Sequence, residues 1–251
     1  MVAPAPLKSQ SPIVVTQARL KAACSACSLQ ELCLPVGLSA AEIEQLDRVI
    51  SSRQTVRRGA WLYRIGDPFL NLYALRSGAF KTLDLSEDGS EKITGFYLPG
   101  EILSLDAIST DRQNFGALAL EDSEVCVLPF ERLEVLLGQI PALQRHFHRI
   151  MSRDIIRDHG LMLLIAGMQA DARLSAFLIG LSQRFANLGY SAMRFRLSMT
   201  REEIGSYLGL TLETVSRLFS RFARDGLILI DRREIEIRDF DALRAIIDHR
   251  A

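Results

Sequence analysis

Lysine is scarce in this chain of 251 residues: four of its 30 basic residues are lysine and the others are arginine. Acidic residues also number 30, so the formal net charge is zero, which excludes a strong overall attraction to nucleic acid. No apolar run approaches the roughly 18 residues that a membrane-spanning helix requires. The first 23 residues lack the basic start, apolar run and cleavage site of a secretory signal. We therefore expect a cytoplasmic protein with no membrane partner.

Groups typical of enzymes are also sparse. The glycines fall singly at turns, without the glycine-rich loop that cradles a phosphate. Three of the four histidines, His146, His148 and His159, fall on one long predicted helix, and no acid–base set converges with them. The sequence therefore predicts that the protein is not an enzyme and that these histidines face the surface. The hydrophobic fraction of 48% is that of a folded chain, and 251 residues favour two domains.

Four cysteines carry the strongest chemical signal. Cys24, Cys27 and Cys33 lie together in CSACSLQELC, and Cys126 lies far along the chain. In a reducing compartment such thiols favour metal ligation over a disulfide framework. Structural zinc sites usually show two close pairs, whereas a four-thiolate iron–sulfur cluster is large enough to bridge irregular spacings. The spacing favours a cluster and leaves open a zinc site or four unrelated buried cysteines. Four apolar neighbours could shield a cluster from water: Leu29, Leu32, Leu34 and Val36.

The pattern along the chain predicts an α+β protein in four segments. Residues 1–38 are expected to form an arm that ends in the cysteine loop. Residues 39–140 begin with a capping box at Ser39 and Glu42, which opens a helix to about residue 50. Turn residues then recur every 8–12 positions, which predicts a small antiparallel sandwich or barrel. Cys126 falls in its last strand, at 125–128.

Residues 141–169 predict a long helix that meets a second copy of the chain. A helix over 141–168 would be about 42 Å long, at about 1.5 Å per residue, which exceeds the face of a small domain. One stripe follows the 4, 3, 4, 3 spacing of a coiled-coil seam: Met151, Ile155, Asp158, Met162 and Ile165. In a symmetric dimer Asp158 would face its own copy and weaken the interface. The alternatives are a helix packed on its own barrel and an Asp158 that faces water.

Residues 170–251 predict a winged helix-turn-helix. A capping box at Thr200 and Glu203 opens a first helix, a second follows from about 211 to 224, and two short strands come after it. Three side chains share the outward face of the second helix and could contact bases: Glu213, Ser216 and Arg217. Four others could contact phosphates: Thr200, Arg201, Thr211 and Arg221. A purely structural helical hairpin is the alternative.

From Cys24 to Leu243 the chain resembles the Crp/Fnr regulators, and most closely the oxygen sensors of the fumarate-and-nitrate-reduction type. The resemblance rests on CSACSLQELCLP, ITGFYLPGEILSLDAI, EVCVLPFERL and FRLSMTREEIGSYLGLTLETVSRLFSRF. It implies an N-terminal antiparallel β-roll, like that of cyclic-nucleotide-binding domains, followed by a dimerisation helix and a winged helix-turn-helix.

The same resemblance implies the function. The four cysteines would ligate a [4Fe–4S] cluster, which oxygen would convert to [2Fe–2S] and then remove. The cluster-loaded homodimer would bind a palindromic site of the TTGAT-N4-ATCAA type in double-stranded DNA, and would activate or repress genes of anaerobic metabolism. Ser28 and Leu32 match positions that tune the reactivity of the cluster, and Ser77 and Gly89 match regions that contact RNA polymerase.

One departure concerns nucleotide binding. The branch of the superfamily that binds cyclic nucleotides carries an Arg-Ser or Arg-Thr pair after its Gly-Glu turn. Gly100-Glu101 is present, but residues 113–116 read QNFG, so we expect no cyclic nucleotide to bind. The alternative functions are a Crp-like regulator that responds to a small molecule, a zinc-stabilised regulator, both without a cluster, and an iron–sulfur electron carrier or enzyme.

Overall fold

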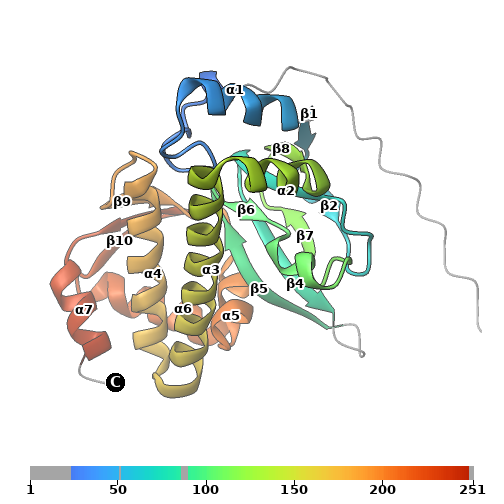
Figure 1. Cartoon of the computed structure of the whole chain (residues 1–251). Helices are drawn as coiled ribbons and strands as arrows, with labels where there is room; N and C mark the ends of the chain where they lie inside the picture. Colours follow the sequence, from blue (N-terminus) through green and yellow to red (C-terminus); the bar gives the residue numbers. More distant parts are fainter. Residues whose placement is uncertain (1–23, 51, 86–89, 249–251) are drawn as a thin grey trace, which may run out of the picture.

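The computed structural model describes residues 24–50, 52–85 and 90–248 (Figure 1). The cysteine loop begins with the short 3-10 helix η1 (Cys24–Ala26) and leads to α1 (Ala40–Val49). Ser39 and Glu42 form the predicted capping box at the start of α1. Each of the two residues satisfies a backbone N–H of the other, which fixes where the helix begins.

The β-roll consists of two four-stranded antiparallel sheets, with strand orders β1-β8-β3-β6 and β2-β7-β4-β5. Its strands are β1 (Ser52–Val56), β2 (Trp61–Tyr63), β3 (Asn71–Ser77), β4 (Phe80–Leu85), β5 (Glu91–Tyr97), β6 (Ile102–Leu103), β7 (Gly116–Ala119) and β8 (Ser123–Pro129). The 3-10 helix η2 (Leu105–Ser109) follows β6. Cys126 lies on β8, as predicted. The turn after β3 requires glycine, because Gly78 has φ 86° and a Cβ there would lie 2.2 Å from Ser123 Oγ.

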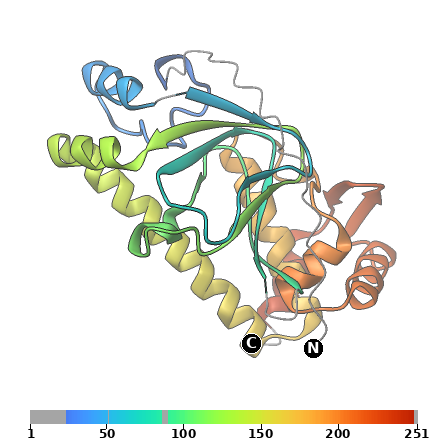
Figure 2. The same ribbon diagram turned by 90° about the vertical axis from the view of Figure 1, so that its right-hand side faces the viewer.

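Two helices follow the roll: α2 (Phe130–Gln139) and α3 (Pro141–Gly167). The predicted long helix is therefore confirmed, at 27 residues. Figure 2 shows α3 running along one side of the roll toward the C-terminal domain. Its first turns are buried through Leu143, Phe147 and Ile150, whereas its second half carries exposed apolar side chains.

The C-terminal domain is the predicted winged helix-turn-helix, with a third strand in its wing. Its elements are α4 (Ala170–Asn187), β9 (Arg194–Arg196), α5 (Arg201–Leu208), α6 (Leu212–Arg224), β10 (Ile228–Asp231), β11 (Glu234–Ile237) and α7 (Phe240–Asp248). Thr200 and Glu203 form the second predicted capping box, and Gly209 ends α5 with φ 64°. The wing sheet has the order β10-β11-β9. The β9 strand and α7 were not predicted.

One apolar core joins the β-roll to the C-terminal domain. Ile93, Phe96 and Leu98 of the roll pack in the same cluster as the buried side chains of α4, α5 and α6. The Phe96 ring lies 6.1 Å from that of Phe177 and 5.1 Å from that of Tyr207. In the described ranges no helix combines the length and apolar composition needed to cross a bilayer.

Candidate functional site

All four cysteines line one pocket between the cysteine loop and the β-roll. The loop turns tightly, because the N–H of Cys27 donates to the carbonyl of Cys24 and the N–H of Cys33 donates to the carbonyl of Leu29, each at 3.0 Å. Cys126 reaches the pocket from β8, where it pairs with Arg53 on β1 and Ala74 on β3. The fold therefore brings the distant fourth cysteine to the first three.

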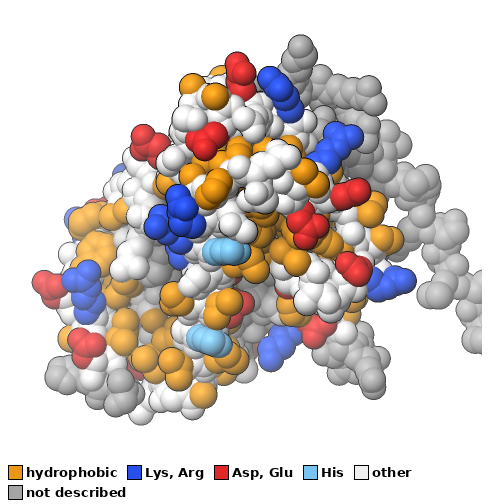
Figure 3. All heavy atoms as spheres, viewed as in Figure 1, with side chains coloured by type: hydrophobic (Ala, Val, Ile, Leu, Met, Phe, Trp, Pro, Cys, Tyr) orange, Lys and Arg blue, Asp and Glu red, His pale blue; other side chains and the backbone are white. Residues whose placement is uncertain are grey.

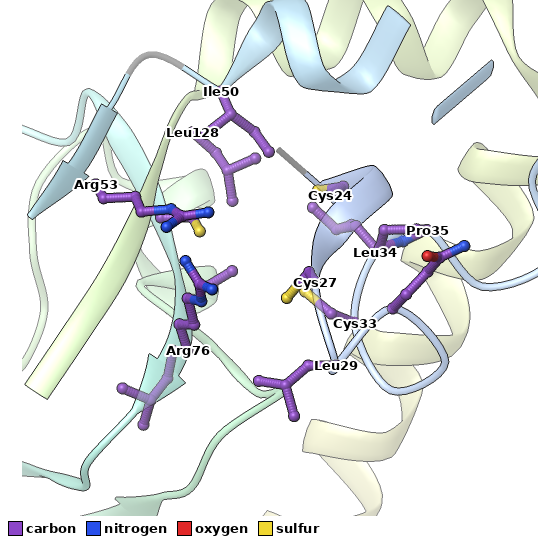
Figure 4. Close-up of a pocket in the computed structure, with 14 residues that line it drawn as sticks. Cys24, Cys27, Leu29, Cys33, Leu34, Pro35, Ile50, Arg53, Arg76 and Leu128 are labelled. Atoms are coloured by element: carbon purple, nitrogen blue, oxygen red, sulfur yellow. The ribbon is translucent and has the colours of Figure 1, made fainter. Parts of the chain in front are cut away.

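The pocket has apolar walls and a charged edge. Its apolar lining includes Leu29, Leu34, Pro35, Ile50 and Leu128. Figure 4 shows Arg53 and Arg76 reaching from the strands toward the side of the loop that carries Cys27 and Cys33. Both guanidinium groups pair with Glu124, at 3.5 and 3.2 Å. Of the four predicted shielding residues, Leu29 and Leu34 line the pocket with the thiols, whereas Leu32 and Val36 line a separate groove beside α3.

The surroundings of Cys24, Cys33 and Cys126 favour the protonated thiol. Burial raises the pKa of Cys24 far above that of an ordinary thiol, and the neighbouring Cys33 adds to the effect. Burial likewise raises the pKa of the Cys33 thiol to about 12. Burial also raises the pKa of Cys126, although Arg53 and Arg76 act in the opposite direction. Ligation of a metal at neutral pH must therefore release protons.

The donor set of the pocket consists of thiols, because the described residues that line it include four cysteines and no histidine or carboxylate side chain. Among the described residues, no group of three or more cysteine, histidine, aspartate or glutamate side chains is arranged to hold one metal ion. A tetrahedral zinc site would require such convergence. In an iron–sulfur cluster each thiolate can bind a different iron atom of a larger core, so the sulfur atoms can stay further apart. The free space enclosed between the loop and β8 is about 30 Å³, and a group bound there would contact the loop directly.

The cysteine loop is fastened at several points. The backbone N–H of Cys24 and the Ser25 hydroxyl donate to the carboxylate of Asp47 on α1. Leu32 packs against Gly100 in the turn before β6, where a Cβ on the glycine would lie 3.2 Å from the Leu32 Cβ. Ser28, proposed from the resemblance to tune the site, is exposed beside Cys27.

His146 corrects one prediction. The sequence placed the histidines of the long helix at the surface, and His148 and His159 are indeed exposed. His146 is buried, and its Nε2 lies 3.0 Å from the carbonyl oxygen of Cys33. Burial lowers the pKa of His146. The signal was present in the sequence, because His146 follows Leu143 by three residues and so shares its buried helix face.

The candidate base-reading residues stand near the start of α6. Thr211 caps this helix, and its hydroxyl accepts from the N–H of Thr214 at 3.2 Å. Glu213 and Arg217 are exposed, and Ser216 is half-buried beside them. Hydrogen bonds from its own backbone and from Thr211 lower the pKa of Glu213, so it is an ionised acceptor near pH 7. This surface offers an acceptor, a hydroxyl and a guanidinium on one face, as major-groove reading requires.

The four candidate phosphate contacts differ in their surroundings. Thr200, Arg201 and Thr211 are exposed at the starts of α5 and α6. The guanidinium of Arg201 lies over the Phe219 ring, at 5.3 Å. Arg221 is already paired within the chain, since its Nη2 lies 2.9 Å from Oδ2 of the buried Asp171 on α4.

The predicted dimer seam faces an open cleft. All five of its residues line a space of about 520 Å³ between α3 and the roll. Ile155 and Met162 are 54% and 58% exposed. Two further apolar side chains, Ile156 and Leu163, are 66% and 72% exposed; they were not predicted because they lie outside the 4, 3, 4, 3 stripe. Figure 3 shows hydrophobic side chains gathered along this part of α3.

The remaining expected positions can be placed in part. Ser77 is exposed at the end of β3, and Gly89 lies outside the described residues. Gln113 is buried and accepts from the Ser104 hydroxyl at 2.7 Å, and the Asn114 amide donates to the carbonyl of Asp106. Glu101 is bound by Arg184. Gln113, Asn114 and Glu101 are thus each hydrogen-bonded within the chain.

Comparison with known protein families agrees with these two domains. Residues 53–139 match the cyclic nucleotide-binding domain, and residues 172–246 match the Crp-like helix-turn-helix domain. The transcriptional regulatory protein Btr of Bordetella pertussis is 49% identical, over 89% of this chain and 93% of its own. The fumarate and nitrate reduction regulatory protein of Escherichia coli is 42% identical over 90% of both chains.

Solved structures place the fold in the same group. FixK2 from Bradyrhizobium japonicum superposes with a TM-score of 0.72 at 28% identity, covering 78% of this chain and 96% of its own. TTHA1359 from Thermus thermophilus, a regulator of the CRP/FNR family, reaches 0.63 at 19% identity, over 80% of this chain and 100% of its own, and supports the fold alone. With relatives of 42–49% identity across nearly its whole length, the chain belongs to the Crp/Fnr family of transcriptional regulators.

Proposed function

We propose that this protein is an oxygen-responsive transcription factor whose cysteine pocket holds a [4Fe–4S] cluster. Cys24, Cys27, Cys33 and Cys126 are the proposed ligands. When bound, the cluster supplies an inorganic core that oxygen converts to [2Fe–2S] and then degrades. The apolar walls restrict the access of water, and the nearby guanidinium groups of Arg53 and Arg76 offset the negative charge of four thiolates.

The response to oxygen is proposed to pass through dimerisation. The cysteine loop contacts the first turns of α3, and the exposed apolar side chains of α3 are the proposed seam between two copies. Asp158 lies on that seam and would meet its own copy, so the dimer is weak enough for a change at the loop to decide its formation. One monomer cannot contact both halves of a palindromic site.

The proposed DNA contacts follow from the exposed face of α6. Arg217 would donate to guanine, Glu213 would accept from cytosine N4, and Ser216 would serve either role. Thr200, Arg201 and Thr211 are the proposed phosphate contacts, and Arg221 could join them only by leaving Asp171. Contacts of the roll with RNA polymerase near Ser77, and a location in the cytoplasm, belong to the same proposal.

A single observation carries the proposal: Cys126 lines the same pocket as the three clustered cysteines although it comes from β8. Four unrelated buried cysteines would have no reason to meet. Relatives named for fumarate and nitrate reduction support the same chemistry.

The decisive experiment is purification without oxygen, followed by iron and sulfide analysis and a visible spectrum, and repeated after exposure to air. We expect about four iron and four sulfide per chain, with absorbance that air bleaches. Cys126→Ser should remove the cluster, because the β8 ligand is lost, whereas the exposed Ser28→Ala beside the loop should retain it. A colourless protein with one zinc per chain would refute the proposal.

A second candidate is a regulator that responds to a small molecule. The cleft of about 520 Å³ between α3 and the roll, and the match of residues 53–139 to the cyclic nucleotide-binding domain, favour it. Calorimetric titration of iron-free protein with cyclic nucleotides separates the two candidates. Micromolar binding that strengthens DNA binding without iron would favour this second function.

A further inference from the structure

His146 forms a hydrogen bond that has no role so far in the proposed function. Its side chain is 5% exposed, and its Nε2 lies 3.0 Å from the carbonyl oxygen of Cys33. A carbonyl oxygen only accepts hydrogen bonds, so Nε2 carries the hydrogen and His146 is the donor. The bond joins α3 to the backbone of a proposed cluster ligand 113 residues away in the sequence.

The bond lies at the edge of the contact between the loop and α3. On one side Leu34 packs into the same core as Leu143 and Phe147. On the other side a groove of about 480 Å³ separates the loop from the next turns of α3, and His146 forms part of its wall. The Cys33 carbonyl also accepts from the N–H of Val36, at 3.3 Å. The histidine is therefore not required to satisfy this carbonyl, and its bond ties two elements together.

The two residues joined by this bond belong to the two parts of the proposed response to oxygen, which are the cysteine pocket and the helix that carries the dimer seam. Cys33 lines the cysteine pocket, so a group ligated by its thiol acts directly on the position of the Cys33 backbone. His146 lies on a continuous helix, and the seam residues Met151 and Ile155 follow it by about 7.5 and 13.5 Å along the axis. A helix without an internal break moves as one body over that length.

We propose that His146 is a positioning residue that couples occupancy of the cysteine pocket to the dimer seam through its hydrogen bond to the Cys33 carbonyl. This inference rests on the proposed function. When the loop shifts, the Cys33 backbone carries His146 with it, and the seam on α3 moves relative to the β-roll. Without the bond, the loop moves across the adjacent groove while α3 stays in place.

Substitutions at residue 146 separate the hydrogen bond from packing. His146→Leu removes the donor and keeps an apolar side chain of similar size. His146→Gln is the matched control, because its amide nitrogen stands the same number of bonds from Cα as Nε2. His146→Asn places its amide one bond short of that position. The full-length proteins are purified without oxygen, analysed for iron and sulfide, and compared by sedimentation equilibrium before and after removal of iron.

The expected result is a loss of coupling with the cluster intact. Wild-type protein and His146→Gln should dimerise more tightly with the cluster than without it. His146→Leu and His146→Asn should hold the same iron and sulfide, but the ratio of their two dimer dissociation constants should fall about tenfold. That figure corresponds to about threefold for the one hydrogen bond lost in each of two copies. Circular dichroism checks the fold, and His146→Asn decides the matter if His146→Leu unfolds.

Three outcomes would overturn the inference. A wild-type ratio in both His146→Leu and His146→Asn would show that α3 receives the signal elsewhere. Loss of iron in both variants would show that the histidine supports ligation and not coupling. A wild-type protein without iron and sulfide would refute the proposed function, and this inference with it, so that result is distinct from the first two.

Discussion

Replacing Glu101 by glutamine tests the contact that joins the β-roll to the C-terminal domain. Its carboxylate accepts from Arg184 Nε at 2.9 Å and from Arg184 Nη2 at 2.6 Å. It also accepts from the N–H of Leu98 at 2.9 Å, and Arg157 Nη1 lies 3.9 Å away. One carboxylate thus ties α4 and α3 to a turn of the roll.

The magnitude follows from charge and exposure. A hydrogen bond to a charged group contributes about 1.5–3 kcal/mol to stability. Arg184 donates two such bonds to the Glu101 carboxylate. The side chains of Glu101 and Arg184 are 25% and 23% exposed, so solvent screening reduces each contribution. Glutamine would also turn a donor toward Arg184. We expect Glu101→Gln to lower the free energy of unfolding by about 2–3 kcal/mol and Tm by roughly 5–10 °C.

Urea unfolding of the iron-free protein measures this loss. Glu91→Gln is the matched control, because Glu91 is exposed at the start of β5 and its replacement should change stability by less than about 0.5 kcal/mol. Arg184→Met supplies the second arm of a double-mutant cycle. An effect of Glu101→Gln below about 0.5 kcal/mol, or an equal effect with and without Arg184, would refute the reasoning.

Three further predictions concern the thiols, the dimer seam and the helix-turn-helix. Burial raises the pKa of Cys33 from 9.0 to about 12, so the unfolded chain loses its thiol proton first, and urea midpoints of the iron-free protein should fall as the pH rises from about 9 toward 12. Asp158→Ala should give a dimer that binds DNA in air, because two carboxylates about 6 Å apart repel by about 2–3 kcal/mol at an effective dielectric of 20; gel shift and sedimentation measure this. Gly205→Ala should lower stability by about 1–3 kcal/mol in urea unfolding, because its Cβ would lie 2.6 Å from the Leu210 carbonyl oxygen.

A stated outcome would contradict each of these predictions. Cys33→Ser should flatten the dependence of the urea midpoint on pH, and a midpoint in the wild-type protein that does not change above pH 9 would contradict the linkage. An Asp158→Ala variant that stays monomeric in air would contradict charge repulsion at the seam. Gly138→Ala on α2 should be neutral or stabilising, since no atom lies within 4 Å of its added Cβ; an equal loss at both glycines would contradict the steric argument.

Local chemistry accounts for what the sequence predicted well. The capping boxes at Ser39 and Thr200 set the starts of α1 and α5, because a hydroxyl and a glutamate three residues later satisfy neighbouring backbone groups. The αL turn at Gly209 ends α5 for an equally local reason. The spacing of the cysteines favoured a cluster, whereas the convergence of Cys126 came from the resemblance.

Long-range pairing accounts for the strand and the ion pair that the sequence did not predict. The β1 strand reads SRQTV, a mostly polar segment whose strand character comes from its pairing with β8. The ion pair of Arg184 with Glu101 joins positions 83 residues apart, and no local sequence pattern around either residue predicts it. His146 was different, because the apolar stripe through Leu143, Phe147 and Ile150 already placed it on the inner face of α3.

The apolar core that the β-roll shares with the C-terminal domain limits how the two domains can be separated. Phe96 and Tyr207 belong to different domains, but their rings lie 5.1 Å apart in one apolar cluster. A chimera that joins residues 170–248 to a foreign sensor domain would lack the apolar side chains that the β-roll contributes to this cluster. The exposed apolar surface would then promote aggregation. An exchange of domains in this protein would therefore have to include β5 together with the DNA-binding domain.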